Sequence, residues 1–387
     1  MKNAVYLQSG GPTSVINASF YGVIRAYQEN AESGTLFGAK YGVQGLIDDR
    51  LIPIRKDRDY SSLTAIPGAV LGSARVKLGD FSDPIYSKIL ATMRKRDIRA
   101  VFVNGGNDSM DTAERLDRYF RYVGYDCTVV GIAKTIDNDL EECDFTPGFP
   151  SAVRYIVKTL TEISLDIRSY QKGRITIVEL MGRDAGWLCA SSALAIDYGL
   201  GPDLIYIPEI PFDPYAFLKD VKQIYGEKQR VLICVSEALK DAHGQYIFCD
   251  DNHLDAFGHK QLGSVSKNLC DWISRYGHYP TRHIELNLMQ RASAHLQSPL
   301  DVRWAEECGF QAAKAAAEGK PGVICIERQN GEIRCALKAF RLVANKVRTM
   351  PPDFLRPDHR DLSRKGKAYF SIFKDDSLRI DIPEEFR

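Results

Sequence analysis

The sequence lacks the features that tie a chain to a membrane, a nucleic acid or a disulfide framework. Its nine cysteines contain no Cys-x-x-Cys pair, which argues against a zinc site and a disulfide-rich scaffold. The 51 lysines and arginines nearly balance 50 aspartates and glutamates, so net charge indicates neither nucleic-acid nor anionic-membrane binding. No uninterrupted apolar run could span a bilayer, and the apolar segment before Gly10 is too short for a signal peptide. We therefore expect reduced, mostly buried thiols and a cytoplasmic protein.

Two common nucleotide-binding motifs are also missing. A dinucleotide dehydrogenase should carry Gly-x-Gly-x-x-Gly after its first strand, where this chain has Ser9-Gly10-Gly11-Pro12. The Gly-Lys-Ser or Gly-Lys-Thr of a P-loop kinase does not occur. The chain has no internal repeat and no low-complexity tract. Any phosphate site must therefore be built from other residues.

The pattern of short strands and helices predicts an α/β fold. A chain of 387 residues exceeds what one hydrophobic core usually supports, so we expect two lobes, with the Pro-rich segment Thr146–Pro150 near a boundary. Strands that alternate with helices are typical of a mostly parallel sheet. The predicted strands are Ala4–Gln8, Ala100–Asn104, Thr128–Ile132, Ile175–Leu180, Leu204–Ile207 and Val231–Val235. The predicted helices follow Ser14, with Ile16, Phe20, Ile24 and Tyr27 on one face, and cover about Met110–Phe120 and Trp187–Ile196.

Two polar loops carry the strongest indication of function. The run Lys134–Asp139 follows Gly105–Ser109 by about thirty residues, and each comes directly after a predicted strand. Asp137 and Asp139 are two residues apart and should point the same way, with the cation of Lys134 beside them. The diglycine lets backbone N–H groups approach an anion closely. Since ligands bind at the carboxyl ends of parallel strands, these loops should converge on one phosphoryl-transfer site.

These residues and others spread over most of the chain resemble the phosphofructokinase family. The matching motifs are Ser9-Gly10-Gly11 with Asn17-Ala18, Leu71-Gly72-Ser73-Ala74-Arg75, Gly105-Gly106, Thr135-Ile136-Asp137-Asn138-Asp139, Met181-Gly182-Arg183, Ile207-Pro208-Glu209 and Gln290-Arg291. The resemblance implies a two-lobed, parallel-sheet-based fold with the active site between the lobes. Residues 1–148 plus about 291–345 would form the pyrophosphate lobe, and residues 149–290 plus about 346–387 the sugar-phosphate lobe.

The family transfers a phosphoryl group to the 1-hydroxyl of fructose 6-phosphate with Mg²⁺. Members that use ATP typically carry glycine at the positions of Asp108 and Lys134. A carboxylate at Asp108 should repel a nucleotide's α-phosphate, since two unit charges about 4 Å apart interact by roughly 4 kcal/mol at an effective dielectric near 20. The resemblance therefore implies the pyrophosphate-dependent branch and a reversible reaction of glycolysis and gluconeogenesis.

The resemblance also assigns a role to each residue at the site. Asp137 is the expected general base, with Thr135 holding the acceptor hydroxyl, Asp139 supporting the base, and Lys134 and Arg183 neutralising charge. The expected donor-binding residues are Gly11, Arg75, Gly106, Asp108 and Lys134. The expected acceptor-binding residues are Thr135, Ile136, Asp137, Arg174, Met181, Gly182, Arg183, Glu209, Arg282, Leu288, Met289, Gln290 and Arg291. In the family, the arginines at positions 174 and 282 reach across a subunit interface, which implies a homodimer or a larger homo-oligomer.

Some residues depart from the family pattern and leave alternatives open. Asn107 stands where the family usually has an aspartate that helps to hold Mg²⁺, so Asn107 and Asp108 are both candidate metal ligands. Asp184 follows the Met-Gly-Arg motif where other side chains are common, and Leu288 replaces a polar or aromatic residue near the acceptor. The alternatives are therefore a kinase that uses ATP, an acceptor such as sedoheptulose 7-phosphate or a nucleoside, and a catalytically silent sugar-phosphate sensor.

Overall fold

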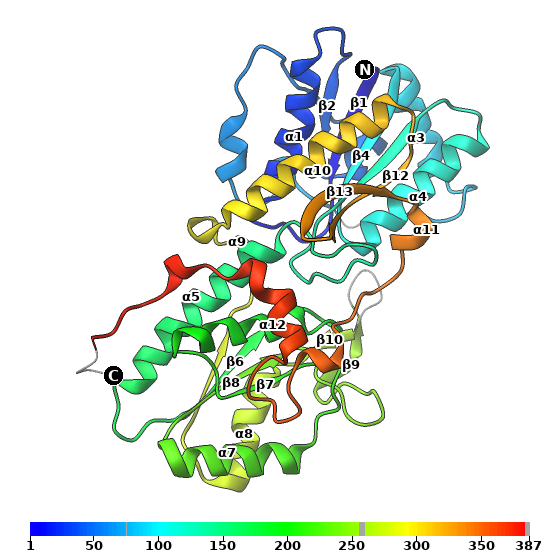
Figure 1. Ribbon diagram of the computed structural model, residues 1–387. Helices are drawn as coiled ribbons and strands as arrows, with labels where there is room; N and C mark the ends of the chain where they lie inside the picture. Colours follow the sequence, from blue (N-terminus) through cyan, green and yellow to red (C-terminus); the bar gives the residue numbers. More distant parts are fainter. Residues whose placement is uncertain (75, 255–259, 384–387) are drawn as a thin grey trace. The chain divides into compact units, whose positions relative to one another are not determined.

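A computed structural model describes residues 1–74, 76–254 and 260–383 (Figure 1). The chain divides into two compact units, of which unit 1 comprises Met1–Ser151 with Arg291–Arg348 and unit 2 comprises Ala152–Gln290 with Thr349–Arg387. The sequence had placed these divisions after residues 148, 290 and about 345. The first division, after Ser151, falls inside the helix Phe149–Arg168. The Pro-rich segment before it is not an open linker, because Thr146 and Phe149 are both fully buried. Which substrate each unit binds stays a prediction.

Unit 1 is built on a mixed sheet of seven strands in the order β13-β12-β5-β4-β1-β2-β3. The five inner strands are parallel, whereas the edge strands β13 and β3 run antiparallel to their neighbours. The α/β fold with parallel-strand sheets is therefore confirmed. The strands are β1 Asn3–Gln8, β2 Leu36–Ala39, β3 Leu51–Pro53, β4 Ile98–Gly105, β5 Thr128–Ala133, β12 Gly322–Gln329 and β13 Glu332–Lys338.

Helices cover both faces of this sheet. The ring of Tyr6 on β1 stacks on Phe20 of α1 with their centroids 4.4 Å apart, whereas Val5 and Leu7 belong to the core that includes Met110 of α4. This alternation follows from the period of two along a strand. The helices of unit 1 are α1 Ile16–Glu29, α2 Val43–Ile47, α3 Pro84–Lys95, α4 Asn107–Tyr122, α10 Pro299–Ala317 and α11 Phe340–Val343. All four residues of the predicted apolar face of α1 are buried.

Two glycines let α1 and α10 lie against each other at close range (Figure 1). A Cβ atom added to Gly22 of α1 would overlap the carbonyl oxygen of Glu306 on α10. In the same way, a Cβ on Gly309 would overlap the carbonyl oxygen of Ser19. Backbone atoms cannot rotate away as the end of a side chain can, so both positions require glycine.

Unit 2 contains a smaller sheet of four parallel strands in the order β11-β6-β8-β7. Its strands are β6 Ile175–Leu180, β7 Leu204–Tyr206, β8 Val231–Ser236 and β11 Thr281–Glu285, with β9 Cys249–Leu254 and β10 Lys260–Leu262 as a separate antiparallel pair. Its helices are α5 Phe149–Arg168, which begins in unit 1, α6 Trp187–Ser191, α7 Pro214–Lys228, α8 Val265–Gly277, α9 Met289–Ala292, which ends in unit 1, and α12 Arg364–Phe370. Short 3₁₀ helices occur at Ser61–Ala65, Ser192–Tyr198, Ala294–Leu296, Pro352–Phe354, Ser371–Phe373 and Asp376–Leu378.

The predicted helix over Trp187–Ile196 is α-helical only to Ser191. The following residues form a 3₁₀ helix because the chain tightens towards Gly199, whose φ is 73°. The N–H of Gly199 donates to the carbonyl of Ile196, three residues earlier, at 2.8 Å.

Two expectations from composition can be checked over residues that the structure describes. Within these residues, no helix is both long enough and apolar enough to cross a membrane. The eight cysteines whose side chains the structure describes are all free and six of them are buried, as expected for reduced core thiols.

The contact between α1 and α10 predicts a sharp difference between glycines. Replacing Gly22 by alanine should lower the free energy of unfolding by about 1–3 kcal/mol, because the new methyl group overlaps rigid backbone. Gly226 in α7 is a matched control, since a Cβ there meets nothing within 4 Å. Alanine at that exposed helical position should raise the free energy of unfolding by about 0.5–1 kcal/mol. Urea unfolding followed by circular dichroism measures both changes, and equal stability of the two variants would contradict the packing argument.

Candidate active site

Three loops of unit 1 follow neighbouring parallel strands and lie along one edge of its sheet. Strand β4 pairs with β1 on one side and with β5 on the other. The loops that follow these three strands begin at Ser9, Gly106 and Lys134. Lys134 joins them, since its N–H donates to Gly105 O at 3.0 Å and its ammonium reaches the first loop. These contacts bring together the two loops singled out in the sequence.

Lys134 is buried beneath the turn that follows β1. Only 2% of the side chain is exposed, and its Nζ donates to the carbonyl oxygens of Ser9 at 3.1 Å and Gly11 at 2.7 Å. Burial disfavours the charged ammonium and lowers the pKa of Lys134 to about 8. The negative charges of Asp137 and Asp139 act in the opposite direction and raise this pKa, whereas the positive charge of Arg291 lowers it further. Lys134 therefore changes its charge in the range where many enzymes work.

Arg291 lies against the same turn. A Cβ atom on Gly11 would come within 2.7 Å of Nη1 of Arg291, so glycine leaves room for the guanidinium. The sequence grouped Arg291 with Arg174 and Arg282 as ligands of the acceptor's phosphate. The structure places Arg291 in unit 1 beside Gly11, whereas Arg174 and Arg282 lie together in unit 2.

The second loop opens helix α4. Gly106 is its N-cap residue, and Asn107 and Asp108 form its first turn, where unpaired backbone N–H groups favour anions. The side chain of Asn107 donates to Lys346 O at 2.6 Å. Its Oδ1 is buried and has no hydrogen-bond partner among the residues described. Asp108 is exposed.

The third loop holds its two carboxylates on one side. Asp137 and Asp139 are half-buried, whereas Ile136 and Asn138 between them are buried, which follows the predicted alternation. The N–H of Asp137 donates to Thr135 Oγ1 at 3.1 Å. These contacts orient the expected base from within its own loop.

Asn138 is a positioning residue that the sequence did not single out. Its φ of 59° lies in the left-handed region, which asparagine tolerates better than most residues. Its Oδ1 accepts a hydrogen bond from the N–H of Thr146 at 3.1 Å, and its carbonyl oxygen accepts one from Nη2 of Arg348 at 2.9 Å. An asparagine between two aspartates is a local indication of a turn in the left-handed conformation, but Asn138 was considered only as part of the Thr135–Asp139 motif.

Asp301 is a second residue that sequence analysis missed. It is fully buried, and its carboxylate accepts the N–H groups of Gly148 at 2.8 Å and Ser151 at 3.1 Å. Burial raises the pKa of Asp301 to about 6, although these hydrogen bonds act in the opposite direction. Gly148 forms a bridge with Thr135, so Asp301 supports the loop that carries Asp137. Nothing local in the sequence reveals a contact over such a separation.

Gln8 and Asn17 hold the loop that leads to the Leu71–Arg75 motif. Gln8 Nε2 donates to Asn17 Oδ1 at 2.7 Å, and Gln8 Oε1 accepts the N–H of Leu71 at 2.9 Å. Ser73 Oγ then donates to Gly10 O at 2.9 Å. The first motif therefore positions the second one. Arg75, a predicted donor-binding residue, lies outside the described residues.

In unit 2, the Met-Gly-Arg motif forms a loop after β6 that is fixed by acidic side chains. Glu237 Oε1 accepts the N–H groups of Gly182 at 3.3 Å and Arg183 at 3.1 Å. Gln290, predicted to bind the acceptor, accepts the N–H of Met181 through its Oε1 at 3.3 Å. Glu237 was not predicted, although it directly follows β8 and so lies at the functional edge of the sheet.

Glu209 anchors the other end of this loop. Its Oε1 accepts the N–H groups of Gly186 at 2.8 Å and Met350 at 2.7 Å, and burial raises its pKa. Its Oε2 is buried and has no hydrogen-bond partner among the described residues. The contacts of Glu209 are therefore with backbone, and its expected role towards sugar hydroxyls stays a prediction.

A cationic pocket lies at the opposite, amino end of β6 and β11. Arg174 directly precedes β6, and Arg282 on β11 pairs with Thr176 of β6. Both arginines and Lys172 line the same pocket. Asp166 Oδ2 accepts Nη1 of Arg282 at 3.2 Å. Leu288 and Met289, which were expected to contact the acceptor, are both about half exposed. The pocket brings together the two arginines that were expected to bind a phosphate.

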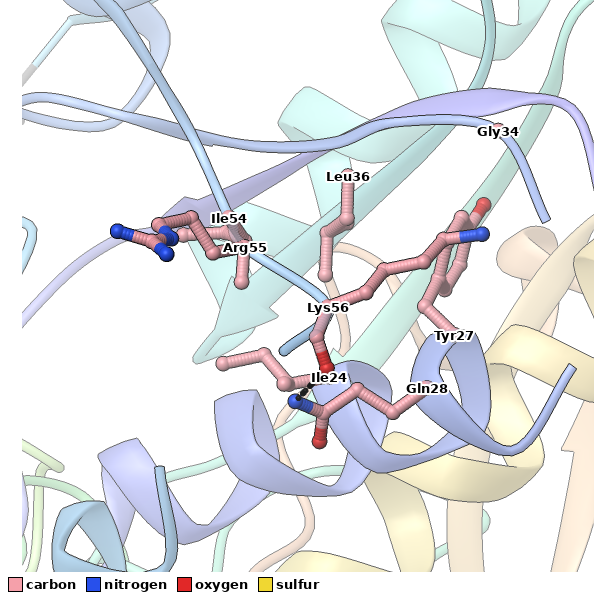
Figure 2. Close-up of a pocket in the computed structure, with 8 residues that line it drawn as sticks. All are labelled: Ile24, Tyr27, Gln28, Gly34, Leu36, Ile54, Arg55 and Lys56. Atoms are coloured by element: carbon pink, nitrogen blue, oxygen red, sulfur yellow. Dashed lines mark hydrogen bonds between the residues drawn. The ribbon is translucent and has the colours of Figure 1, made fainter. Parts of the chain in front are cut away.

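A further pocket in unit 1 offers no comparable chemistry (Figure 2). It lies at the amino end of the parallel strands and is lined by apolar residues such as Ile24, Leu36 and Ile54. Figure 2 shows the carboxamide of Gln28 directed at the carbonyl of Lys56, to which it donates at 3.0 Å. Its two cations already have partners, since Arg55 pairs with Asp57 and Lys56 donates to the carbonyl oxygens of Ala31 and Ser33. We therefore assign no site to this pocket.

The comparisons with known proteins agree with the geometry. The model of the phosphofructokinase family matches residues 3–316. A pyrophosphate–fructose 6-phosphate 1-phosphotransferase from Xanthomonas campestris is 35% identical over 383 residues, which cover 95% of this chain and 90% of that protein. The crystal structure of a pyrophosphate-dependent phosphofructokinase from Nitrosospira multiformis is similar with a TM-score of 0.86 and 28% identity, covering 96% of this chain and 92% of that one.

A second solved structure, of a pyrophosphate-dependent phosphofructokinase from Marinobacter aquaeolei, has a TM-score of 0.84 and 29% identity. That alignment covers 96% of this chain and 91% of the other. The similarity thus extends over nearly the whole length of each protein. The chain belongs to the phosphofructokinase family.

Proposed function

We propose that this protein transfers a phosphoryl group from pyrophosphate to the 1-hydroxyl of fructose 6-phosphate. The products are fructose 1,6-bisphosphate and phosphate, and the reaction is reversible and serves glycolysis and gluconeogenesis. The observation that carries the proposal is the buried ammonium of Lys134, which is held on the turn at Gly11 and is stabilised electrostatically by Asp137. The names of the relative from Xanthomonas campestris and of the two solved structures support the same donor.

Asp137 is the general base in this mechanism. It takes the proton of the 1-hydroxyl as that oxygen bonds to the transferred phosphorus, while the bridging P–O bond breaks and phosphate leaves. Thr135 fixes the position of Asp137 through the hydrogen bond from the Asp137 N–H. Lys134 and Arg291 supply positive charge beside the donor turn, where the leaving phosphate gains negative charge. Arg183 is the proposed charge-neutralising residue from the acceptor loop, and Asp139 supports the base.

Asp108 and Lys134 together favour the shorter donor. Asp108 is exposed in the first turn of α4, where its carboxylate repels the further phosphate that a nucleotide would bring. Pyrophosphate has no such group. An ATP-dependent reaction remains the alternative for the donor, and sedoheptulose 7-phosphate for the acceptor.

Mg²⁺ is the proposed cofactor. Within the described residues, no group of three or more histidine, cysteine or acidic side chains is arranged to hold a metal ion. The unpaired, buried Oδ1 of Asn107 and the adjacent carboxylate of Asp108 are nevertheless the oxygen ligands that Mg²⁺ prefers, and the ion keeps several waters. Asn107 and Asp108 would hold the ion, which would neutralise charge on the donor phosphates.

The cationic pocket of unit 2 is the proposed binding site for the acceptor's 6-phosphate. Arg174 and Arg282 both line this pocket, and guanidinium groups suit phosphate oxygens. We propose that these two arginines serve the active site of a neighbouring subunit in a homodimer or larger homo-oligomer.

The pKa of Lys134 predicts how activity depends on pH. Because the pKa is lowered, the ammonium is present below about pH 8 and is lost above it. Hence kcat/KM for pyrophosphate should fall about tenfold per pH unit above pH 8. The profile of kcat should bend at higher pH, since a bound anion stabilises the ammonium. The variant Lys134→Met should be slow, and neither of its two pH profiles should show the loss of activity that is due to the lysine. Any change caused by titration of pyrophosphate itself should be the same in both proteins. A wild-type profile that stays level to pH 9.5 would exclude this role.

The base and the shared site can be tested in one mixing experiment. Asp137→Ala should lower kcat by about 10²–10⁴-fold, and Arg282→Ala should raise KM for fructose 6-phosphate. If sites are shared, the hybrid dimer contains one site with neither defect, so mixing equal amounts should restore roughly a quarter of wild-type activity. No recovery after verified subunit exchange would indicate that each chain builds its own site.

Donor choice is tested by removing the two discriminating side chains. Asp108→Gly should lower turnover with pyrophosphate and make ATP detectable as a donor, because the repulsion is gone. Adding Lys134→Gly should increase the use of ATP further, and the two effects should be non-additive since both groups face one phosphate. A coupled assay that compares pyrophosphate, ATP and ADP measures these changes. Efficient use of ATP by the wild type would refute the role of Asp108.

A further inference from the structure

The acceptor loop Met181–Gly186 has a backbone conformation that its sequence does not favour. Gly182 has a φ of 136°, and Arg183 has a φ of 48°, in the left-handed region that costs free energy for residues other than glycine. A Cβ on Gly182 would also lie 2.5 Å from the carbonyl oxygen of Ala185. Such a conformation persists only where surrounding contacts impose it.

Asp184 provides a contact of this kind, and it reaches outside the loop. Its Oδ1 accepts the hydroxyl of Tyr246 at 2.8 Å and lies 2.5 Å from Nζ of Lys240. The ammonium of Lys240 also lies 5.2 Å from the centre of the Tyr246 ring, within cation–π range. Three side chains from two segments therefore form one cluster.

Tyr246 and Lys240 belong to a tight hairpin after β8. The two residues form an antiparallel bridge, and the N–H of Ile247 donates to Leu239 O at 3.0 Å. At the turn, the carboxylate of Asp241 accepts the N–H groups of His243 at 2.8 Å and Gln245 at 2.9 Å. The hairpin is thus held together without Asp184, so it is a preformed support for the acceptor loop.

We propose that Asp184, Lys240 and Tyr246 form a latch that positions Arg183 for the sugar-phosphate acceptor. The inference rests on the proposed function. Glu237 fixes the backbone of Gly182 and Arg183 from one side, and the latch fixes the next residue from the other. Asp184 is a positioning residue, since it acts through Arg183. Without the latch, the loop can leave the left-handed conformation at Arg183. Binding of the acceptor must then also order the loop, which weakens binding.

Two substitutions separate this role from a general loss of stability. Asp184→Ala removes both contacts of the latch and should raise KM for fructose 6-phosphate at least tenfold. Tyr246→Phe removes only the hydroxyl and should raise the same KM about three- to tenfold. For both variants, KM for pyrophosphate should stay within about twofold of wild type and Tm within about 2 °C, because the latch lies in unit 2 and its three side chains are only partly buried.

A matched control comes from another ion pair of the same unit. Asp353 lies 2.5 Å from Lys365, as Asp184 does from Lys240, and both residues of that pair are more than half exposed. Asp353→Ala should therefore leave both KM values unchanged. A double-mutant cycle adds a direct test, since Asp184→Ala should have little further effect in an Arg183→Ala background.

The outcomes distinguish the two proposals. A wild-type KM for fructose 6-phosphate in Asp184→Ala would overturn the latch, as would equal rises in both KM values with a lower Tm. If the wild type has no pyrophosphate-dependent activity, the proposed function fails. In that case the latch is tested by titration calorimetry with fructose 6-phosphate. The latch predicts that the dissociation constant of Asp184→Ala is at least ten times that of the wild type. Equal binding, or none by the wild type, would overturn it.

Discussion

The buried ammonium of Lys134 is the interaction on which the geometry of unit 1 depends. It bonds to the carbonyl oxygens of Ser9 and Gly11, and so joins the loops after β1 and β5 across the intervening strand β4. A cation in this position has to be stabilised by neighbours, because burial alone drives its proton off. Backbone carbonyls and the carboxylates of Asp137 and Asp139 supply that stabilisation. The same contacts that keep Lys134 charged therefore also hold the loops in place.

Carboxylates serve throughout the molecule as anchors for backbone N–H groups. Asp301 holds Gly148 and Ser151, Glu237 holds Gly182 and Arg183, and Glu209 holds Gly186 and Met350. An acidic side chain can accept two such hydrogen bonds at once, which makes it effective where a loop has no strand or helix to pair with. The loops at the site thus have fixed shapes although they lack regular structure.

Strands β1 and β4 to β8 could be predicted from local sequence pattern, whereas β2, β3 and β9 to β13 were not predicted. The strand Ile175–Leu180 was predicted with its observed bounds, and the other predicted strands to within a few residues, because a buried parallel strand has a continuous β-branched and apolar sequence. The two central glycines of α1 and α10 could not be predicted as a contact, since nothing local shows which helices will meet. The predicted helix after Trp187 was too long, because a change from α to 3₁₀ geometry depends on how the chain approaches Gly199.

The candidate site was predictable where residues act at short range and not where they act at long range. Lys134, Asp137 and Asp108 were visible as motifs next to strand ends. Asp301 and Glu237 were missed because each lies far along the chain from the groups that it holds. The resemblance to a known family supplied roles that local pattern alone could not, but it left open how each side chain is supported.

Under the proposed roles of Asp108 and Lys134 in donor choice, their different burial restricts the order in which a lineage can change its phosphoryl donor. Asp108 is exposed on a helix turn, so it can be replaced without disturbing its surroundings. Loss of Lys134 instead empties a buried volume and leaves the carbonyls of Ser9 and Gly11 without their donor. An ancestor that first lost the lysine would have carried a destabilised loop with little gain, whereas one that first lost the aspartate would have kept a folded loop, although with lower turnover. Evolution between the two donors therefore runs most easily in one order, through an intermediate that retains the lysine.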